Sequence, residues 1–212
     1  MTATLPEQVF QVMLRMRVAT GAQEAFDAAL ADVAQVAADN RHNLQQWIMR
    51  SADDPSEVLV FSDWDSEEAF RSHEATHEHR AAVSALRRHR AEGSMTTSRV
   101  VHQVAKANPP ARPVRVMVWY YAGDTDEATI RAAHRQIETS VCGTPGLVKA
   151  ELHRSLSAPD EYLVISEWSD VAAFREWEVT AVHRVQTAPL RPYLDRRRSQ
   201  PYGFYEILSV DE

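Results

Sequence analysis

The 212-residue chain has few of the residues on which several classes of protein depend. Its one cysteine, Cys142, excludes an intrachain disulfide and is typical of a protein that folds in a reducing cytoplasm. It has only six glycines, and it contains no Gly-rich phosphate loop, dinucleotide fingerprint or nucleophile elbow. We therefore expect a cytoplasmic protein without a nucleotide-type cofactor.

Positive charge and long apolar runs are also scarce. Lys and Arg number 23 against 30 Asp and Glu, which gives a formal net charge of −7. The one cationic run, Arg196 to Arg198, is better explained as the solvated end of a helix than as a phosphate-binding surface, so we expect no nucleic-acid partner. No apolar run approaches the length of a membrane span, and the first residues lack the pattern of a secretory signal. We expect no association with a membrane.

What the sequence does contain is a long internal repeat. The segment DWDSEEAFRSHEATHEHR at residues 63–80 recurs as EWSDVAAFREWEVTAVHR at residues 167–184, and Trp168 follows Trp64 by 104 positions. The same offset relates further pairs from about residue 12 to about residue 86 without a gap. A fixed self-similarity of this length predicts two homologous domains in tandem.

The proline-rich segment AKANPPARP lies between the copies, at residues 105–113. Its prolines disfavour helix and strand, so we expect a stiff linker there. The predicted N-terminal domain covers residues 1–104, and the predicted C-terminal domain covers residues 114–212.

Each copy is predicted to have the order β-α-β-β-α-β. Alternating or apolar runs predict strands at residues 9–18, 44–51, 57–64 and 96–104, and again at 114–122, 147–155, 161–168 and 203–210. In each copy one helix follows the first strand, and a second follows the third strand, from Asp65 to about residue 91 in the first copy. This order is that of a ferredoxin-like α+β fold, with two helices on one face of an antiparallel sheet. Because the other face is apolar, we expect the two domains to pack sheet to sheet as an intramolecular α/β barrel pseudo-dimer.

Three segments of the second copy resemble the antibiotic biosynthesis monooxygenase (ABM) family. They are TPGLV at 144–148, APDEYLVISEWSD at 158–170 and Ala-Phe at 173–174. The first copy has the family's helix pattern more fully, at Trp64, Phe70, His73, Thr76 and His79. The resemblance covers nearly the whole chain, twice.

The resemblance implies a dimeric α/β barrel with a pocket between helices and sheet in each half. It implies small oxygenases of aromatic polyketide pathways, which oxidise anthrone-like or naphthacenone-like phenols to quinones with O2 and without flavin, haem or metal. Haem-degrading enzymes, quinol oxygenases and angucycline ring-opening oxygenases look similar, so the fold alone does not define the reaction. The haem-degrading branch has an Asn in its first strand, which VFQVMLRMRV lacks.

One position departs from the family pattern. Several family oxygenases have an Asn four residues before the Trp that ends the third strand, and this chain has Val60 and Val164 there. The protein therefore either uses other polar groups or lacks the usual reaction.

The second helix differs between the copies in a way that indicates a polar pocket in the first half. Positions spaced three and four residues apart share a helix face. This face carries Phe70, His73, His77 and Ala81 in the first copy, and Phe174, Trp177, Ala181 and Val185 in the second. Two imidazoles thus stand where the second copy has a predicted apolar core.

His73 or His77 is the predicted general base, because imidazole titrates near neutrality and is able to deprotonate an acidic phenol. The structural alternative is that the helix is rotated, so that both residues are solvated or satisfied within the fold. Two imidazoles without an evident third ligand do not predict a metal site.

Aromatic and cationic residues on the strands are the further candidates. Trp64 is assigned to the catalytic site, where it stacks on a planar polycycle or, alternatively, fills the core. Arg15 and Arg17, which correspond to Trp119 and Tyr121, are candidates to hold a phenolate or carboxylate, with exposed salt bridges as the alternative. The predicted substrate-binding residues are Arg15, Arg17, Trp47, Phe70, Trp168, Trp119 and Tyr121.

The sequence thus predicts a cofactor-independent oxygenase that acts on a phenolic polycycle of aromatic polyketide biosynthesis, with O2 as co-substrate and reduced flavin as a possible addition. The alternative is a non-redox cyclase or binding protein that uses the same pocket. We expect the active pocket in the N-terminal half, and a monomeric pseudo-dimer or a homodimer.

Overall fold

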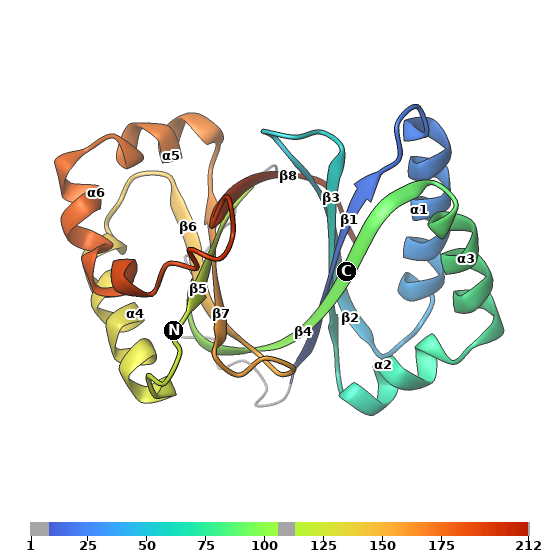
Figure 1. Ribbon diagram of the computed structural model, residues 1–212, viewed down its shortest axis with the longest axis horizontal. Helices are drawn as coiled ribbons and strands as arrows, with labels where there is room; N and C mark the ends of the chain where they lie inside the picture. The colour runs from blue at the N-terminus through green and yellow to red at the C-terminus, as the bar shows by residue number, and fades with distance from the viewer. Residues whose placement is uncertain (1–8, 106–112, 212) are drawn as a thin grey trace. The chain divides into compact units, whose positions relative to one another are not determined.

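The computed structural model describes residues 9–105 and 113–211 (Figure 1). Most of the predicted linker lies outside the described residues. The described residues form two compact units, which we call the N-terminal unit (residues 9–98 and 207–211) and the C-terminal unit (residues 99–105 and 113–206).

The N-terminal unit is built from a four-stranded antiparallel sheet and three helices. Its elements are β1 (Phe10–Val18), α1 (Gln23–Ala38), β2 (Asn43–Ser51), β3 (Glu57–Trp64), α2 (Glu67–Glu74), α3 (His77–Arg87) and the first part of β4 (Arg90–Ala105), whose residues 99–105 belong to the C-terminal unit. The strand order is β4–β1–β3–β2, and the register places Phe10 opposite Trp64.

The C-terminal unit repeats this plan. Its elements are β5 (Val114–Tyr121), α4 (Glu127–Val141), β6 (Leu147–Ser155), β7 (Glu161–Trp168), α5 (Val171–Glu178), α6 (Ala181–Gln186), the 3₁₀ helix η1 (Ala188–Tyr193) and the first part of β8 (Tyr202–Asp211), whose residues 207–211 belong to the N-terminal unit. The strand order is β8–β5–β7–β6, with Val114 opposite Trp168. The predicted tandem of two ferredoxin-like units is confirmed.

The bounds of the elements repeat at the offset seen in the sequence. Strands β6 and β7 begin 104 residues after β2 and β3, at 147 against 43 and at 161 against 57. Helix α5 begins 104 residues after α2, at 171 against 67. Structurally equivalent residues in the two units therefore differ by 104 in number.

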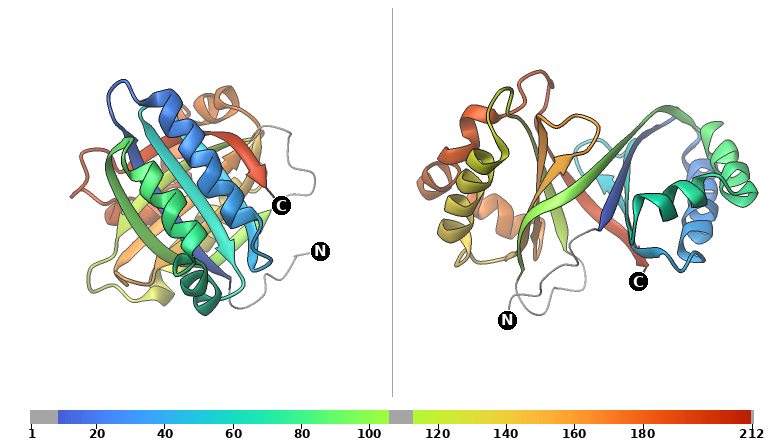
Figure 2. Two further views of the ribbon diagram at one scale, coloured as in Figure 1. Left: turned by 90° about the vertical axis from the view of Figure 1, so that its right-hand side faces the viewer. Right: turned by 90° about the horizontal axis from the view of Figure 1, so that it is seen from below.

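The helices of the N-terminal unit cover one face of its sheet. Helices α1 and α3 lie side by side over the strands (Figure 2, left), and their apolar sides close a core that contains Phe26, Leu30 and Leu86. Side chains alternate between the two faces of a strand. Met16 and Val18 of β1 lie in this core, so Arg15 and Arg17 lie on the face away from the helices.

The prediction of one helix from Asp65 to about residue 91 is wrong, because two helices occupy this range. Helix α2 ends at Glu74, and Thr76 begins α3 as its N-cap, with its hydroxyl accepting a hydrogen bond from the His79 backbone N–H at 3.2 Å. Thr is a favoured N-cap because it satisfies a free amide of the first turn. Thr180 does the same for α6 with the His183 N–H at 3.0 Å.

The last helix of the sandwich is shorter in the C-terminal unit. Helix α3 has 11 residues, whereas its equivalent α6 has six and continues as η1, which contains Pro189 and Pro192. Proline removes a backbone donor and clashes with the preceding turn of an α-helix. The equivalent residues of the N-terminal unit are Ala85 and Arg88, which allow α3 to continue.

Candidate functional site

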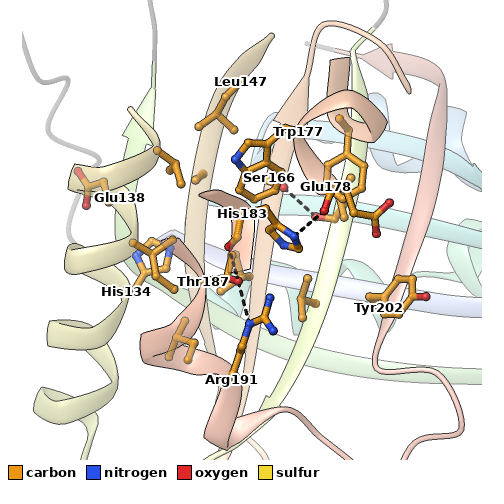
Figure 3. Close-up of a pocket in the computed structure, with 18 of the residues that line it drawn as sticks. His134, Glu138, Leu147, Ser166, Trp177, Glu178, His183, Thr187, Arg191 and Tyr202 are labelled. Carbon is orange, nitrogen blue, oxygen red and sulfur yellow. Dashed lines mark hydrogen bonds between the residues drawn. The ribbon is translucent and has the colours of Figure 1, made fainter. Parts of the chain in front are cut away.

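The C-terminal unit contains a cavity of about 260 Å³ between its sheet and its helices. The floor is the helix-facing side of β5, β6 and β7, and the walls are α4 on one side and α5, α6 and η1 on the other (Figure 3). Most of the lining is apolar and includes Val116, Val164, Ile137 and Leu190. A concave, mainly apolar site with a few polar groups is the usual form of a small-molecule site.

Small and helix-breaking residues open this cavity. Ala150 of β6 lines it, whereas the equivalent Gln46 of the N-terminal unit is buried and reaches across to α1, where its amide donates to the Ala34 carbonyl at 3.4 Å. The prolines of η1 end α6 early, so that α4 faces a short helix and a 3₁₀ turn instead of a full-length helix. At the corresponding place in the N-terminal unit, Gln46 is buried and α1 packs along α3.

Three aromatic rings form one wall of the cavity. The centroid of Trp168 lies 5.2 Å from that of Phe174 and 5.0 Å from that of Trp177. The indole N–H of Trp168 donates to Ser166 Oγ at 3.0 Å, and that of Trp177 donates to Gln186 Oε1 at 2.7 Å. With both indole N–H groups satisfied, the wall offers flat apolar surface to a ligand.

His183 supplies an imidazole to the same wall. Its position in the first turn of α6 follows from the Thr180 cap, and its ring lies 4.4 Å from Trp177. The Nδ1–H donates to the Glu178 carbonyl at 2.9 Å, which fixes the tautomer and leaves the lone pair on Nε2. Burial lowers the pKa of His183 below its usual value, and this effect outweighs the hydrogen bond from Nδ1, which raises it. His183 is therefore a neutral base at pH 7.

A guanidinium group is held next to this imidazole. Arg191 of η1 is exposed at the cavity, and its Nε donates to Thr187 Oγ1 at 3.1 Å. The Thr187 hydroxyl donates in turn to the His183 carbonyl at 2.8 Å. Figure 3 shows the Arg191 side chain extending from η1 toward His183. The site can thus remove a proton and hold the resulting anion beside a cation.

Further polar groups lie on the other walls. His134 of α4 is only 1% exposed and lines the cavity, as does the partly buried Glu138 one turn later. Tyr120 of β5 contributes a phenol whose pKa is raised well above its usual value by burial, so this hydroxyl keeps its proton.

In the N-terminal unit, three of the predicted site residues pack together. The ring of Trp64 lies 5.5 Å from Phe70 and 4.7 Å from His73, which is 3% exposed. The Asn40 side-chain nitrogen is 3.3 Å from His73 Nδ1. Burial, and after it the nearby His79, lowers the pKa of His73 to about 4. Open polar grooves lie beside His73 and Asn40 on the outer side of this cluster.

His77 lies apart from this cluster. The prediction that it shares a helix face with His73 is wrong, because the chain turns at Thr76 between α2 and α3. His77 is exposed at the start of α3. His79 contacts His73 instead, with ring centroids 4.5 Å apart. In the second copy, likewise, Ala181 and Val185 are exposed and do not form the apolar core expected there.

The structure places the remaining candidates on the sheet faces away from the helices. Arg15 donates to Glu57 with Nη2 at 2.5 Å, and Arg17 pairs with Asp54. Their equivalents Trp119 and Tyr121 lie beneath the guanidinium groups of Arg198 and Arg197. Trp47 also lies on the far face, because its neighbour Ile48 is in the helix-side core. Of the predicted substrate-binding residues, Trp168 alone lines the cavity described above.

Four residues that line the cavity are absent from the predicted site residues: His183, Arg191, Trp177 and His134. His183 repeats His79, so a comparison based on differences between the copies passed over it. The available signals were Pro189 and Pro192 in the second copy, which shorten a helix, and a His at 134 where the first copy has Leu30.

No group of three or more His, Cys, Asp or Glu side chains within residues 9–105 and 113–211 is arranged to hold a metal ion. In the same part of the chain, no helix has the length and apolar character needed to cross a membrane.

Comparison with known proteins identifies the family. The model of the family described as antibiotic biosynthesis monooxygenase matches residues 9–85 and again residues 113–185. Protein SchA of Streptomyces halstedii is 29% identical over 90 residues, which are 42% of this chain and about a quarter (24%) of that protein.

Solved structures share the fold along nearly the whole chain. A candidate monooxygenase from Fusobacterium nucleatum has a TM-score of 0.76 at 9% identity, over 98% of this chain and 96% of that one. An anthrone oxidase-like protein has a TM-score of 0.71 at 12% identity, over 96% and 93%. At these identities the likeness concerns the fold alone. With the family model matched once in each copy, the chain belongs to the antibiotic biosynthesis monooxygenase family.

Proposed function

We propose that the protein is an oxygenase that uses O2 to oxidise a phenolic, anthrone-like or angucycline-like polycycle, and that the reaction takes place in the cavity of the C-terminal unit. The observation that carries the proposal is His183, a neutral imidazole with its lone pair on Nε2, in an apolar cavity walled by Trp168 and Trp177. Membership of a monooxygenase family supports the reaction type.

In the proposed reaction, His183 Nε2 takes the acidic proton of the substrate. The resulting anion is held against the aromatic wall, and Arg191 stabilises its charge. The electron-rich carbon then gives its electrons to O2, a carbon–oxygen bond forms, and the product is a peroxide anion. The proton on His183 is available to neutralise that anion. Burial lowers the pKa of His183, so the imidazole is free to accept the substrate's proton and then returns it readily.

The substrate class follows from the shape and polarity of the cavity. Ligand cavities usually measure roughly 300–1,000 Å³, so a volume of about 260 Å³ favours a compact, flat polycycle. The aromatic wall stacks such a ring system, while His183 and Arg191 meet an acidic oxygen at its edge. An intermediate of aromatic polyketide biosynthesis has these properties.

The proposed reaction uses O2 as the co-substrate and no bound cofactor, since a phenolate-type carbanion is itself the reductant. A ring-opening reaction would in addition draw on reduced flavin from another enzyme. A reaction in the cavity of the C-terminal unit suits a monomeric pseudo-dimer, and a homodimer would carry this cavity twice.

One observation favours a non-redox cyclase or binding protein as the second candidate. Val164 lines the cavity at the position where the resemblance implies an Asn in several family oxygenases. Without that amide, the site has one polar group fewer to act on a peroxide. A base and a cation still suffice to enolise a ketone or to bind a phenol.

The test is oxygen uptake by the purified, chelator-treated protein with an anthrone-type phenol, with and without reduced flavin. We expect uptake above the spontaneous rate without flavin, and a loss of at least about a hundredfold in His183→Ala, as for removal of a general base. His79→Ala changes the equivalent residue of the N-terminal unit and is the matched control, which we expect to retain activity.

Three other outcomes point elsewhere. Loss of activity in His73→Ala or His79→Ala, with His183→Ala unaffected, would move the site to the N-terminal unit. Uptake only with flavin would assign the ring-opening reaction. Tight binding of the phenol without uptake in any variant would establish the cyclase or binding protein.

A further inference from the structure

Two polar groups of the cavity are linked through a third side chain, that of Thr187, at the junction of α6 and η1. The Thr187 hydroxyl lies 2.8 Å from the His183 carbonyl, and a carbonyl oxygen only accepts, so the single hydrogen of the hydroxyl is used in this bond. The Thr187 oxygen then acts as an acceptor, and it receives the Nε–H of Arg191 at 3.1 Å. The guanidinium is thus held at Nε, and its terminal amino groups are left to donate to a ligand (Figure 3).

No carboxylate balances the charge of Arg191 in the part of the chain that the structure describes. Within residues 9–105 and 113–211, Arg191 forms no ion pair with Asp or Glu, although Glu178 lines the same cavity. The Glu178 carboxylate pairs with Arg175 at 2.7 Å. Burial raises the pKa of Tyr120 and lowers that of His183, and the charge of Arg191 acts to lower the pKa of both. The positive charge is therefore felt at the floor of the cavity as well as at its wall.

The N-terminal unit has the equivalent arginine without the hydroxyl. The residues 104 positions before Arg191 and Thr187 are Arg87 and Val83, and Arg87 is exposed on α3. Valine at position 83 shows that a helix forms there without the hydroxyl. An unrestrained arginine loses rotamer freedom when it binds a ligand, whereas a guanidinium that is already held loses less. The bond from Thr187 therefore favours a ligand that the guanidinium recognises.

We propose that Thr187 is a positioning residue that holds the Arg191 guanidinium toward the cavity, so that the site binds its ligand as an anion, an aromatic phenolate or enolate, in preference to the neutral form. This inference rests on the proposed function for the place of the site, and it adds the ionisation state in which the ligand is held. A guanidinium suits such an oxygen because its N–H groups form charge-assisted hydrogen bonds. Thr187 transfers no proton itself and acts through Arg191.

The test measures ionisation of a bound phenol in the absence of O2. The probe is 4-nitro-1-naphthol, a flat two-ring phenol whose neutral form and anion absorb at different wavelengths. It is titrated with pH in the presence of excess full-length protein, and its pKa is compared with that of the free probe. We expect the wild-type protein to lower the pKa of the bound probe by about one unit, which is about a tenfold preference for the anion. The uncharged 1-nitronaphthalene reports binding of the same rings without the hydroxyl.

The variants separate positioning from a structural role. Thr187→Val should lose most of the shift in the pKa of the probe and bind 1-nitronaphthalene within about twofold of wild type, whereas Thr187→Ser keeps a hydroxyl and should retain the shift. Thr139→Val is the matched control. The Thr139 hydroxyl donates to the Arg135 carbonyl at 2.9 Å on the exposed side of α4, which is the same kind of bond without an attached guanidinium. This variant should behave as wild type.

A double-mutant cycle tests whether Thr187 acts through Arg191. Arg191→Ala should lose the shift, and adding Thr187→Val to it should change the pKa of the bound probe no further, because the two residues act as one unit. A further loss in the double variant would overturn the positioning role. The same conclusion would follow from a Thr187→Val shift equal to that of wild type, from a wild-type protein that leaves the pKa of the probe unchanged, or from the failure of both probes to bind.

These outcomes are distinct from those that test the oxygenase. The probe titration consumes no O2, so a negative result overturns the role of Thr187 and leaves the oxygen-uptake result untouched. A shift that depends on Thr187 supports the inference even in a protein that oxidises no phenol tested, and the anion site would then belong to a cyclase or a binding protein.

Discussion

Acid is expected to destabilise the N-terminal unit through one buried imidazole, His73. The ring lies in contact with Trp64 and His79, 4.7 and 4.5 Å between centroids, and is 3% exposed. Burial is the main reason that its pKa falls from 6.5 to about 4, and the positive charge that His79 can carry adds to the effect. The folded state thus disfavours a charge that the unfolded chain accepts.

The sign and size follow from proton linkage. Between pH 6.5 and about pH 4, the unfolded chain binds a proton at His73 and the folded protein does not, so stability falls as the pH falls. The contribution is fully present above pH 6.5. At pH 4.5 the pH lies about two units below the pKa of His73 in the unfolded chain. Because each unit corresponds to about 1.36 kcal/mol, the free energy of unfolding has fallen by about 2.5 kcal/mol.

The assay compares urea unfolding, followed by circular dichroism, at pH 7.5 and pH 4.5. We expect the wild-type protein to lose about 2.5 kcal/mol more between these conditions than His73→Leu. His77→Ala removes an exposed histidine at the start of α3 and should lose as much as wild type. Peptide-resolved hydrogen exchange assigns the change to the N-terminal unit. Equal losses in wild type and His73→Leu would refute the argument, because the acid-sensitive group would then be another.

Two further substitutions test the cavity of the C-terminal unit. Ala150→Gln introduces the side chain that is buried at the equivalent position of the N-terminal unit. We expect this variant to bind a planar phenol at least about tenfold more weakly in a tryptophan fluorescence titration, and to keep the wild-type melting temperature in calorimetry. Unchanged affinity would place the ligand elsewhere. Trp177→Ala removes a half-buried ring from the aromatic wall. We expect urea unfolding to show a loss of about 2 kcal/mol in the free energy of unfolding, which is less than for a fully buried Trp. A variant as stable as wild type would show that this wall is not part of the packed core.

The internal repeat made the fold largely predictable. Strands β3 and β7 begin and end at the predicted residues 57–64 and 161–168, because each contains a run of four apolar or aromatic residues and follows a turn. The helices were less predictable. In the sequence, the helical spacing of Phe70 and His73 extends to His77, although the helix itself ends before it. The Thr76 hydroxyl marks this break, because it caps the next helix and also donates to the His73 carbonyl at 2.8 Å. Such local competition leaves the hydrophobic pattern unchanged.

The candidate site was much less predictable, because a cavity is defined by what is small or missing. His73 and His77 led to the prediction of an active pocket in the N-terminal half. In the structure, His73 packs among aromatic rings and His77 is exposed. The space in the C-terminal unit results from Ala150 and from the prolines of η1, none of which carries chemistry. Their effect depends on which side chains face them across the fold, and that information is tertiary.

The pair His79 and His183 shows why residue identity alone does not assign the role. Both residues lie three positions after a Thr N-cap. The ring centroid of His79 lies 4.5 Å from that of His73, and the ring centroid of His183 lies 4.4 Å from that of Trp177. In the N-terminal unit the ring of His79 lies against another imidazole, and its Nδ1 is buried without a hydrogen-bond partner among the described residues. In the C-terminal unit the Nδ1 of His183 is bonded to a carbonyl, and the ring borders an open cavity. The duplicated histidine thus becomes a candidate base only where its Nδ1–H is bonded and a ligand has room beside it, and that room depends on residues that differ between the copies, such as Ala150 and Pro189.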